Sequence, residues 1–335
     1  AYGSGATLRP GLSAVTVNLT NSDNTVGTLG STSFTFNPGD YYKTTTFQPL
    51  ASGSATISIT EAPAGYTLPT NYQSTVYTIT APNLSMGSSY GFTIGRHMEL
   101  GGYYVSLGVA PPVATTVTIT SPDPTKLLLS SDGTTLGNSS ISFNLNAGQT
   151  YTPQFFVQAT GGPICTVTPC TAANYALSVT AAGYNPATAM ITINPSGFAL
   201  QGSDFATTTS SSSTTLTVVP AMLDPMYLNA LQIQQLIPGS TGTQATITLS
   251  DPNTAQPSTI GDIVPSPNVI FNGVDVPNYR TSSFQPVAVG TGILRVTSPA
   301  GFSQSSNQVT VTVTSPEGQQ AFGYNLSRPA QGPLR

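Results

Sequence analysis

Charged residues are scarce in this chain. Only 6% of its 335 residues are Asp, Glu, Lys or Arg, and the formal net charge is −4. A surface that binds nucleic acid or an anionic membrane needs clustered Lys and Arg, and the chain has only eight of them. It also lacks an apolar run long enough for a transmembrane helix. We therefore expect no nucleic-acid partner and no membrane insertion.

Residues that carry catalysis or bind metals are equally scarce. His97 is the only histidine, and one histidine without clustered carboxylates makes neither a catalytic triad nor a metal site. Asp23, Asp123 and Asp251 recur at corresponding turns, but calcium takes six to eight oxygen ligands, so we favour turn capping. We expect no enzyme activity, no catalytic residue, no cofactor and no metal, and we expect His97 to be an ordinary strand residue.

The chain has only two cysteines, Cys165 and Cys170, in the sequence Cys-Thr-Val-Thr-Pro-Cys. A metal site would need further Cys or His nearby, and none is present. The pair therefore predicts a small disulfide that closes a local loop, in preference to free thiols. A structural disulfide indicates an oxidising setting outside the cell.

The residues that are present favour strands. Hydrophobic residues make up 38% of the chain and alternate with Ser and Thr, while good helix formers are few. Turn-forming residues, among them 32 Gly and 28 Pro, separate the alternating runs. This pattern predicts an all-β protein built from short antiparallel strands.

The same pattern is written three times, which indicates a tandem repeat. An aromatic or apolar strand, a Phe-centred strand, an alternating strand, an Ala-Gly-Tyr/Phe step and a final alternating strand follow one another in each copy. The distance from Phe36 to Phe47 is 11 residues, and so is the distance from Leu145 to Phe156. In the third copy the distance from Phe271 to Phe284 is 13 residues.

The repeats predict three tandem β-sandwich domains with a C-terminal extension. The first comprises residues 1–82 and lacks its first strand, and the second comprises residues 83–200 with the Cys-clipped insertion. The third comprises residues 201–316 and follows a Ser/Thr-rich linker, for which we single out residues 207–215. Residues 317–335 form the extension.

The repeats resemble a known family. The opening Val117-Thr-Ile-Thr-Ser-Pro-Asp123, the Phe-Gln-Pro centre at Phe47 and Phe284, and the Ala-Gly-Tyr/Phe step before a Val-Thr-Val-Thr strand are similar to bacterial immunoglobulin-like repeats of the Big/invasin type. Such repeats occur in tandem in secreted and cell-surface proteins. The resemblance implies immunoglobulin-like sandwiches at the cell surface, in a stalk, an adhesin or a filament, and it supplies no catalytic residue.

The two ends of the sequence differ from a regular array. The first repeat has no counterpart of the strand at 216–219, which would leave an apolar groove and an unpaired sheet edge. The extension carries Phe322, Tyr324 and Leu326 at strand spacing and resembles the opening of the second repeat at 90–98. It is a candidate donor strand. The sequence leaves two suppliers open: the tail of another copy, or a neighbouring repeat of a longer array.

These features predict a structural protein of the cell exterior. The favoured interpretation is a subunit of an extracellular filament or surface stalk whose partner is itself, in a head-to-tail homopolymer. The alternative is an adhesin or a stalk segment that binds surface glycans or another ligand on a host or neighbouring cell. Tyr41-Tyr42 and Tyr103-Tyr104 are the tyrosine pairs that could stack on sugars, although strand packing is the more common role.

Overall fold

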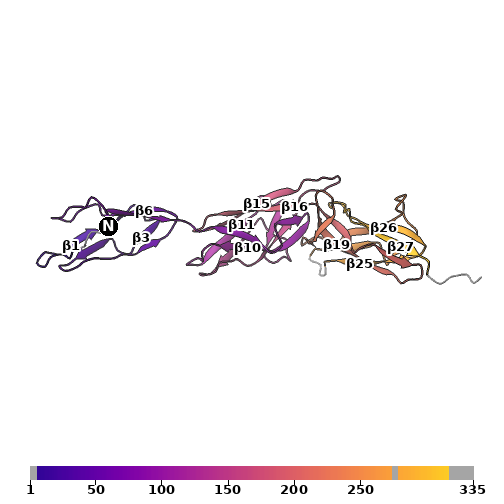
Figure 1. The fold of residues 1–335 in the computed structure, drawn as a ribbon, viewed down its shortest axis with the longest axis horizontal. Helices are drawn as coiled ribbons and strands as arrows, with labels where there is room; N and C mark the ends of the chain where they lie inside the picture. Colours follow the sequence, from indigo (N-terminus) through magenta and orange to yellow (C-terminus); the bar gives the residue numbers. More distant parts are fainter. Residues whose placement is uncertain (1–5, 274–277, 317–335) are drawn as a thin grey trace, which may run out of the picture.

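A computed structural model describes residues 6–273 and 278–316 of the chain. All regular structure in these residues is β-strand, which confirms the all-β prediction. The strands form three successive units in a row (Figure 1). Among the described residues, no helix is long and apolar enough to span a membrane.

The second unit shows the complete architecture. Its strands are β8 (Leu84–Ser88), β9 (Thr93–Gly95), β10 (Met98–Leu107), β11 (Thr115–Thr120), β12 (Leu127–Ser130), β13 (Ser140–Leu145), β14 (Phe155–Ala159), β15 (Ala173–Ala181) and β16 (Ala187–Asn194). One sheet has the order β13-β11-β15-β16-β9, and the other has β12-β14-β10 with β8 also on β10. Strand β9 pairs in parallel with β16, whereas the other pairs are antiparallel. This two-sheet arrangement is an immunoglobulin-like sandwich.

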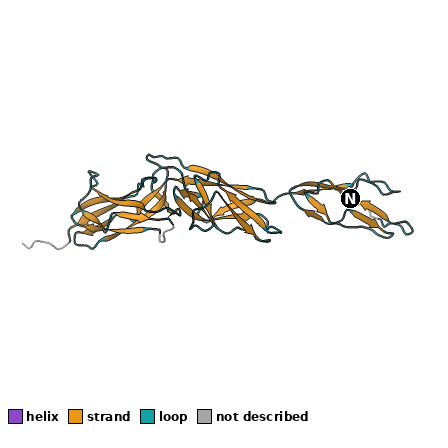
Figure 2. Ribbon diagram, turned by 180° about the vertical axis from the view of Figure 1, so that it is seen from behind, coloured by secondary structure: helices purple, strands orange, loops and turns teal. Residues whose placement is uncertain are grey.

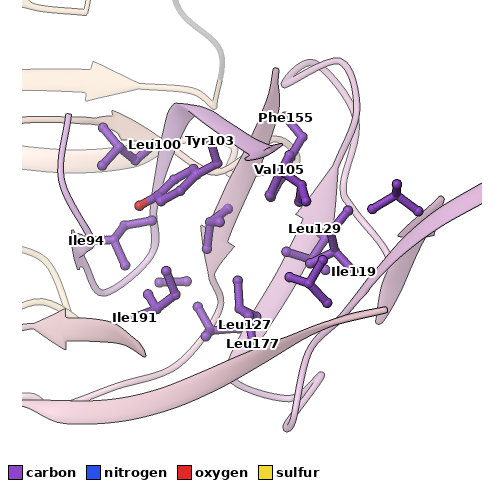
Figure 3. Packing of buried hydrophobic residues seen from close by; sticks show 14 of the residues in the cluster. Ile94, Leu100, Tyr103, Val105, Ile119, Leu127, Leu129, Phe155, Leu177 and Ile191 are labelled. Atoms are coloured by element: carbon purple, nitrogen blue, oxygen red, sulfur yellow. The ribbon is translucent and has the colours of Figure 1, made fainter. Parts of the chain in front are cut away.

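The core of the second unit lies between these sheets (Figure 3). Tyr103 and Val105 of β10 are fully buried and face Phe155 of β14 and Ile119 of β11 in this core. The alternation predicted from the sequence produces this arrangement, because successive strand residues point to opposite faces of a sheet. Strand β10 therefore places side chains in the middle of the sandwich, and β9 closes one edge.

The third unit repeats this plan. Its strands are β17 (Ser196–Gln201), β18 (Phe205–Thr208), β19 (Thr214–Leu223), β20 (Ala230–Ile233), β21 (Gln235–Leu236), β22 (Thr243–Ser250), β23 (Gly261–Val264), β24 (Asn268–Phe271), β25 (Arg280–Pro286), β26 (Gly290–Thr297) and β27 (Val309–Thr314). The sheets are β18-β27-β26-β22-β24 and β17-β19-β25-β23, with β20 also on β19. Strand β18 again pairs in parallel with the last strand, β27.

Two sequence expectations meet a different arrangement here. The boundary expected between residues 200 and 201 falls inside β17, which pairs with β19 and packs in the core of the third unit. The expected linker at 207–215 is a strand, a short turn and the start of another strand, because it contributes to both β18 and β19. Thr has a high strand propensity, and the tract runs along a sheet instead of crossing solvent.

The first unit is much less complete. Its strands are β1 (Val15–Asn18), β2 (Thr20–Asn21), β3 (Gly27–Leu29), β4 (Ser33–Phe36), β5 (Phe47–Pro49), β6 (Gly53–Ser58) and β7 (Ser74–Ile79). They pair as β1-β4, β2-β6-β7 and β3-β5. The described part of this unit contains no counterpart of β8, β9 or β10. Of the described hydrophobic residues in this unit, only Val26, Ala55 and Ile57 are buried.

Ile193 and Ile79 make a matched pair for testing this difference. Ile193 is fully buried in β16, whereas Ile79 at the corresponding place in β7 is only half-buried. We expect Ile193→Ala to lower the free energy of unfolding of its unit by about 2–5 kcal/mol, the usual cost of such a cavity. Ile79→Ala should cost clearly less in the isolated chain. Denaturant titration of both variants checks this, and equal losses would contradict an open first unit.

Candidate functional site

The open interior of the first unit is the main candidate site. Two hollows of about 440 and 400 Å³ lie in it. The first is lined mostly by apolar groups, among them Val15, Val17, Phe36 and Leu68. The second includes Leu19, Leu29, Phe47, Ile57 and Tyr77. Together we call these lining residues the open groove.

The groove occupies the position of a core in the other units. Residues of its wall have counterparts in the second unit that are buried around Tyr103: Leu29 corresponds to Leu129, and Phe47 to Val157. In the third unit the counterpart of Phe47 is Phe284, which is fully buried, whereas Phe47 is only half-buried. The groove is therefore the interior of a sandwich in which one sheet lacks its inner strand.

The edge beside β7 is exposed as well. Tyr77 of β7 is 42% exposed, whereas its counterparts Ile191 in β16 and Val311 in β27 are both 0% exposed. In the second and third units a parallel strand, β9 or β18, covers this edge. In the first unit the Tyr77 ring instead stacks on Phe47, with the ring centroids 4.7 Å apart. This edge can pair with another strand through its backbone groups.

The structure places the other sequence-predicted residues as follows. Asp23 and Asp123 each accept hydrogen bonds from the backbone and hydroxyl of a Thr two residues later, and Asp251 accepts from the backbone N–H groups of Asn253 and Thr254. Their carboxylates cap turns. Within the described ranges, no group of three or more His, Cys, Asp or Glu side chains could hold a metal ion.

The tyrosine pairs have different environments. Tyr103 is fully buried, so this member of the second pair cannot stack on a sugar. Tyr41 and Tyr42 are both exposed, and Tyr41 lines the open groove. Phe322, Tyr324 and Leu326, the predicted donor residues, lie outside the described residues.

The disulfide forms between Cys165 and Cys170 as predicted. Its position adds a role that the spacing did not reveal. The N–H of Cys165 donates to Ser303 Oγ at 2.9 Å, and the N–H of Cys170 donates to the carbonyl of Pro225 at 2.8 Å. Both acceptors belong to the third unit, so the disulfide loop connects the second and third units through two hydrogen bonds. We call the loop with these two hydrogen bonds the clasp.

His97 also lies at this junction, in the turn between β9 and β10, and not in a strand as expected. Its ring centroid is 5.5 Å from that of Phe302 in the third unit. Burial and the neighbouring Arg96 charge lower the pKa of His97. Arg96 itself donates from Nε to the carbonyl of Gly301 and from Nη1 to that of Gly162. His97 is therefore a packing residue between two units.

Comparison with known proteins adds only weak likenesses. No family model matches the chain, and no curated protein matches it. Among solved structures, the D0-D1 domain of intimin is 11% identical over 70% of this chain and 100% of that one, with a TM-score of 0.24. Adhesin InvE of Yersinia pseudotuberculosis is 15% identical over 72% of this chain and 63% of that one, with a TM-score of 0.26.

Domains 4–9 of the surface layer protein SbsC are 11% identical over 89% of this chain and 39% of theirs, with a TM-score of 0.22. These TM-scores are low. The function of this chain is therefore inferred from its own geometry.

Glu99 introduces a pH dependence at the same junction. It is buried in β10, accepts a hydrogen bond from Gln158 Nε2 at 2.6 Å, and pairs across the units with Gln235. Burial, with a smaller contribution from the Asp132 charge, raises the pKa of Glu99 to about 7. A raised pKa means that the folded state favours the protonated acid. Its contribution to stability is full below about pH 4.5 and is lost as the pH rises to about 7.

We expect Glu99→Gln to remove this loss, because a neutral amide can still accept from Gln158. Above pH 7 the variant should unfold at a higher temperature than the native chain. Its free energy of unfolding should be larger by an amount on the order of 2–3 kcal/mol. The two should converge below about pH 4.5. Thermal unfolding across this range measures the effect, and exposed Glu61→Gln is the control. An unchanged pH profile for Glu99→Gln would contradict the assignment.

The clasp predicts a separate outcome for reduction of the disulfide. The double variant Cys165→Ser, Cys170→Ser should lose less than the roughly 3 kcal/mol typical of a 15-residue loop. It should also widen the range of angles between the second and third units, because the loop carries the hydrogen bond to Ser303. Small-angle scattering measures that range. Ser303→Ala, which removes the contact and keeps the disulfide, should widen it too; a rigid junction in both variants would refute the clasp.

Proposed function

We propose that this chain is a non-enzymatic structural subunit of an extracellular filament or surface stalk, whose copies join head to tail by strand complementation. The observation that supports this is the open groove of the first unit. An immunoglobulin-like sandwich with an uncovered interior exposes apolar surface that normally lies inside a domain. The disulfide supports a place outside the cell, where such bonds persist.

The shape and chemistry of the groove favour a strand as its occupant. Among the described residues β7 is the edge strand of its sheet, and the adjoining hollows offer apolar space for alternate side chains. An added strand satisfies both through main-chain hydrogen bonds and side-chain burial. A small polar ligand would leave the apolar wall formed by Val17, Phe36 and Phe47 exposed.

The tail of a second copy is the proposed donor. Figure 1 shows the first unit and β27 at opposite ends of the row, with the second unit between them, which favours a donor from another copy. Burying Phe322, Tyr324 and Leu326 would contribute roughly 5–9 kcal/mol, at about 1.5–3 kcal/mol for each side chain. Donor and acceptor surfaces differ, so the contact is heterologous and repeats into an open filament unless it closes into a ring.

A second candidate function is an adhesin or stalk that binds a glycan. Exposed Tyr41 and Tyr42 favour it, because aromatic rings can stack on sugars. Tyr41 lines the first of the two hollows, so donor-strand entry and sugar binding would compete for that surface. Selective glycan binding by the monomer that is lost in Tyr41→Ala and Tyr42→Ala would support this alternative.

Deletion of residues 319–335 should abolish assembly, because it removes the proposed donor strand. Sedimentation and electron microscopy of the purified protein should show filaments for the native chain and monomers for the truncated one. Deleting only residues 330–335 keeps the three donor side chains and should preserve filaments.

Filaments of normal length and heat resistance from the chain lacking residues 319–335 would contradict donation by this tail. That result would favour the other supplier, a neighbouring repeat on a longer polypeptide. The thermal unfolding of the second and third units should be the same in all three proteins, which separates loss of assembly from loss of folding.

A further inference from the structure

Resting on the proposed function, we propose the register of the joint between copies. The tail of one copy adds to the first unit of the next as a parallel strand beside β7, with Phe322 opposite Tyr77 and Tyr324 opposite Ile79. The joint between two chains thereby repeats the edge pairing of the two joints within one chain.

The two covalent joints show the direction. After leaving the last strand of one unit, the chain first forms β8 or β17, which pairs antiparallel in the other sheet, and then β9 or β18, which runs parallel to the last strand of the next unit. Thr93 of β9 pairs with Thr192 of β16, and Phe205 of β18 pairs with Val311 of β27. A tail that arrives from the preceding copy in line enters the first unit from the same end. It therefore runs parallel to β7.

The same joints indicate which tail residue would lie opposite Tyr77. Phe205 lies opposite Val311, the counterpart of Tyr77, and packs edge-on against Phe284 with the ring centroids 6.0 Å apart. In the second unit, Phe92 directly precedes Thr93, and its ring centroid is 5.9 Å from that of Tyr103. Each complete sandwich thus has a phenylalanine at the start of its parallel edge strand or directly before it.

The tail has the same pattern. Phe322-Gly-Tyr324-Asn325 matches Phe92-Thr-Ile94-Gly95 in the placement of its large side chains. Phe47, the counterpart of Phe284, stands in the groove with Tyr77 stacked on it and presents an aromatic wall. Phe322 would meet this wall as Phe205 meets Phe284. Tyr324 would follow on the same face, as Ile94 follows Phe92.

A second placement in the groove has the opposite direction. Gly323-Tyr-Asn-Leu-Ser327 is similar to Gly102-Tyr-Tyr-Val-Ser106 of β10, so the tail could instead pair antiparallel with β5. Strand β10, however, starts beside the following unit, where Met98 pairs with Leu236, and ends beside the preceding one. A tail in that place would have to enter from the far side of the first unit, beside the second unit.

Engineered cysteines distinguish the placements. In the proposed register, Asn325 lies opposite Thr80, as Gly95 lies opposite Asn194. A register shifted by four residues, with Leu326 opposite Tyr77, puts Asn325 opposite Val76. The antiparallel placement puts Tyr324 opposite Thr45 and Asn325 beside Thr44, because Tyr103 pairs with Phe155. Thr80, Val76 and Thr44 are all exposed, so cysteine at these positions leaves packing intact.

The experiment combines Asn325→Cys with Thr80→Cys, Val76→Cys or Thr44→Cys in the full chain, assembles each variant under reducing conditions and then oxidises it. Each variant also carries Cys165→Ser and Cys170→Ser, so new disulfides report only the engineered pairs. We expect the Thr80→Cys variant to form covalent multimers in most assembled chains, and the other two to remain at background.

Each alternative outcome has a distinct meaning. Preferential crosslinking through position 76 or position 44 would overturn the proposed register and leave strand complementation standing. Assembly without crosslinking at any of the three positions would also overturn the register. Failure of the native chain to assemble would overturn the proposed function, and the register with it.

Discussion

The structure depends on one constraint: a two-layer sandwich buries its interior only when both of its sheets are complete. One sheet needs its inner strand, and the other needs a strand that covers its edge. In the second and third units, β10 and β19 are inner strands of one sheet, and β9 and β18 close the edge of the other sheet beside the last strand. The described first unit has only the paired strands β1-β4, β2-β6-β7 and β3-β5, without either element. Phe47 and Ile79 are consequently half-buried, whereas their counterparts Phe284 and Ile193 are inaccessible to water. The proposed assembly follows from the need to cover that surface.

The second and third units provide a stiff body on which such a joint can act. Arg96, Gln234 and the Cys165–Cys170 loop all hydrogen-bond across their junction, and β21 of the third unit pairs with β10 of the second. The connection between the first and second units is thinner in both views (Figures 1 and 2). It is secured by Asn185, which donates through its backbone N–H to the carbonyl of Pro82 and through Nδ2 to that of Ala81. Bending is therefore expected at the thinner joint.

Much of the fold could be predicted from local sequence, because alternation determines which strand face is buried. Thus Val117 and Ile119 alternate with Thr and are fully buried on one face of β11. Contacts between units could not be predicted in this way. The spacing of Cys165 and Cys170 identifies a disulfide but not Ser303, which lies 138 residues further along the chain and completes the clasp. The local sequence predicts a strand at His97 and a linker at Thr207–Thr215. Packing between units places His97 in a turn, and sheet pairing places much of the Thr-rich tract in strands.

The open groove could be predicted only in part. Comparing repeats revealed that a strand was missing from the first one, but not that the edge beside β7 would be uncovered together with the interior. That finding needs the parallel pairing of β9 and β18, which has no signal in a single alternating stretch. Parallel pairing joins residues that are distant in sequence, so a local pattern does not reveal it.

Amide hydrogen exchange in β7 tests the central claim most directly. The assembled and monomeric states of the native chain would be compared for the peptide covering residues 74–79, with β16 and β27 as internal references. Strand addition predicts that exchange in β7 slows by at least about tenfold on assembly, because its edge amides gain partners, while β16 and β27 stay unchanged. Equal exchange of β7 in the two states would contradict the account.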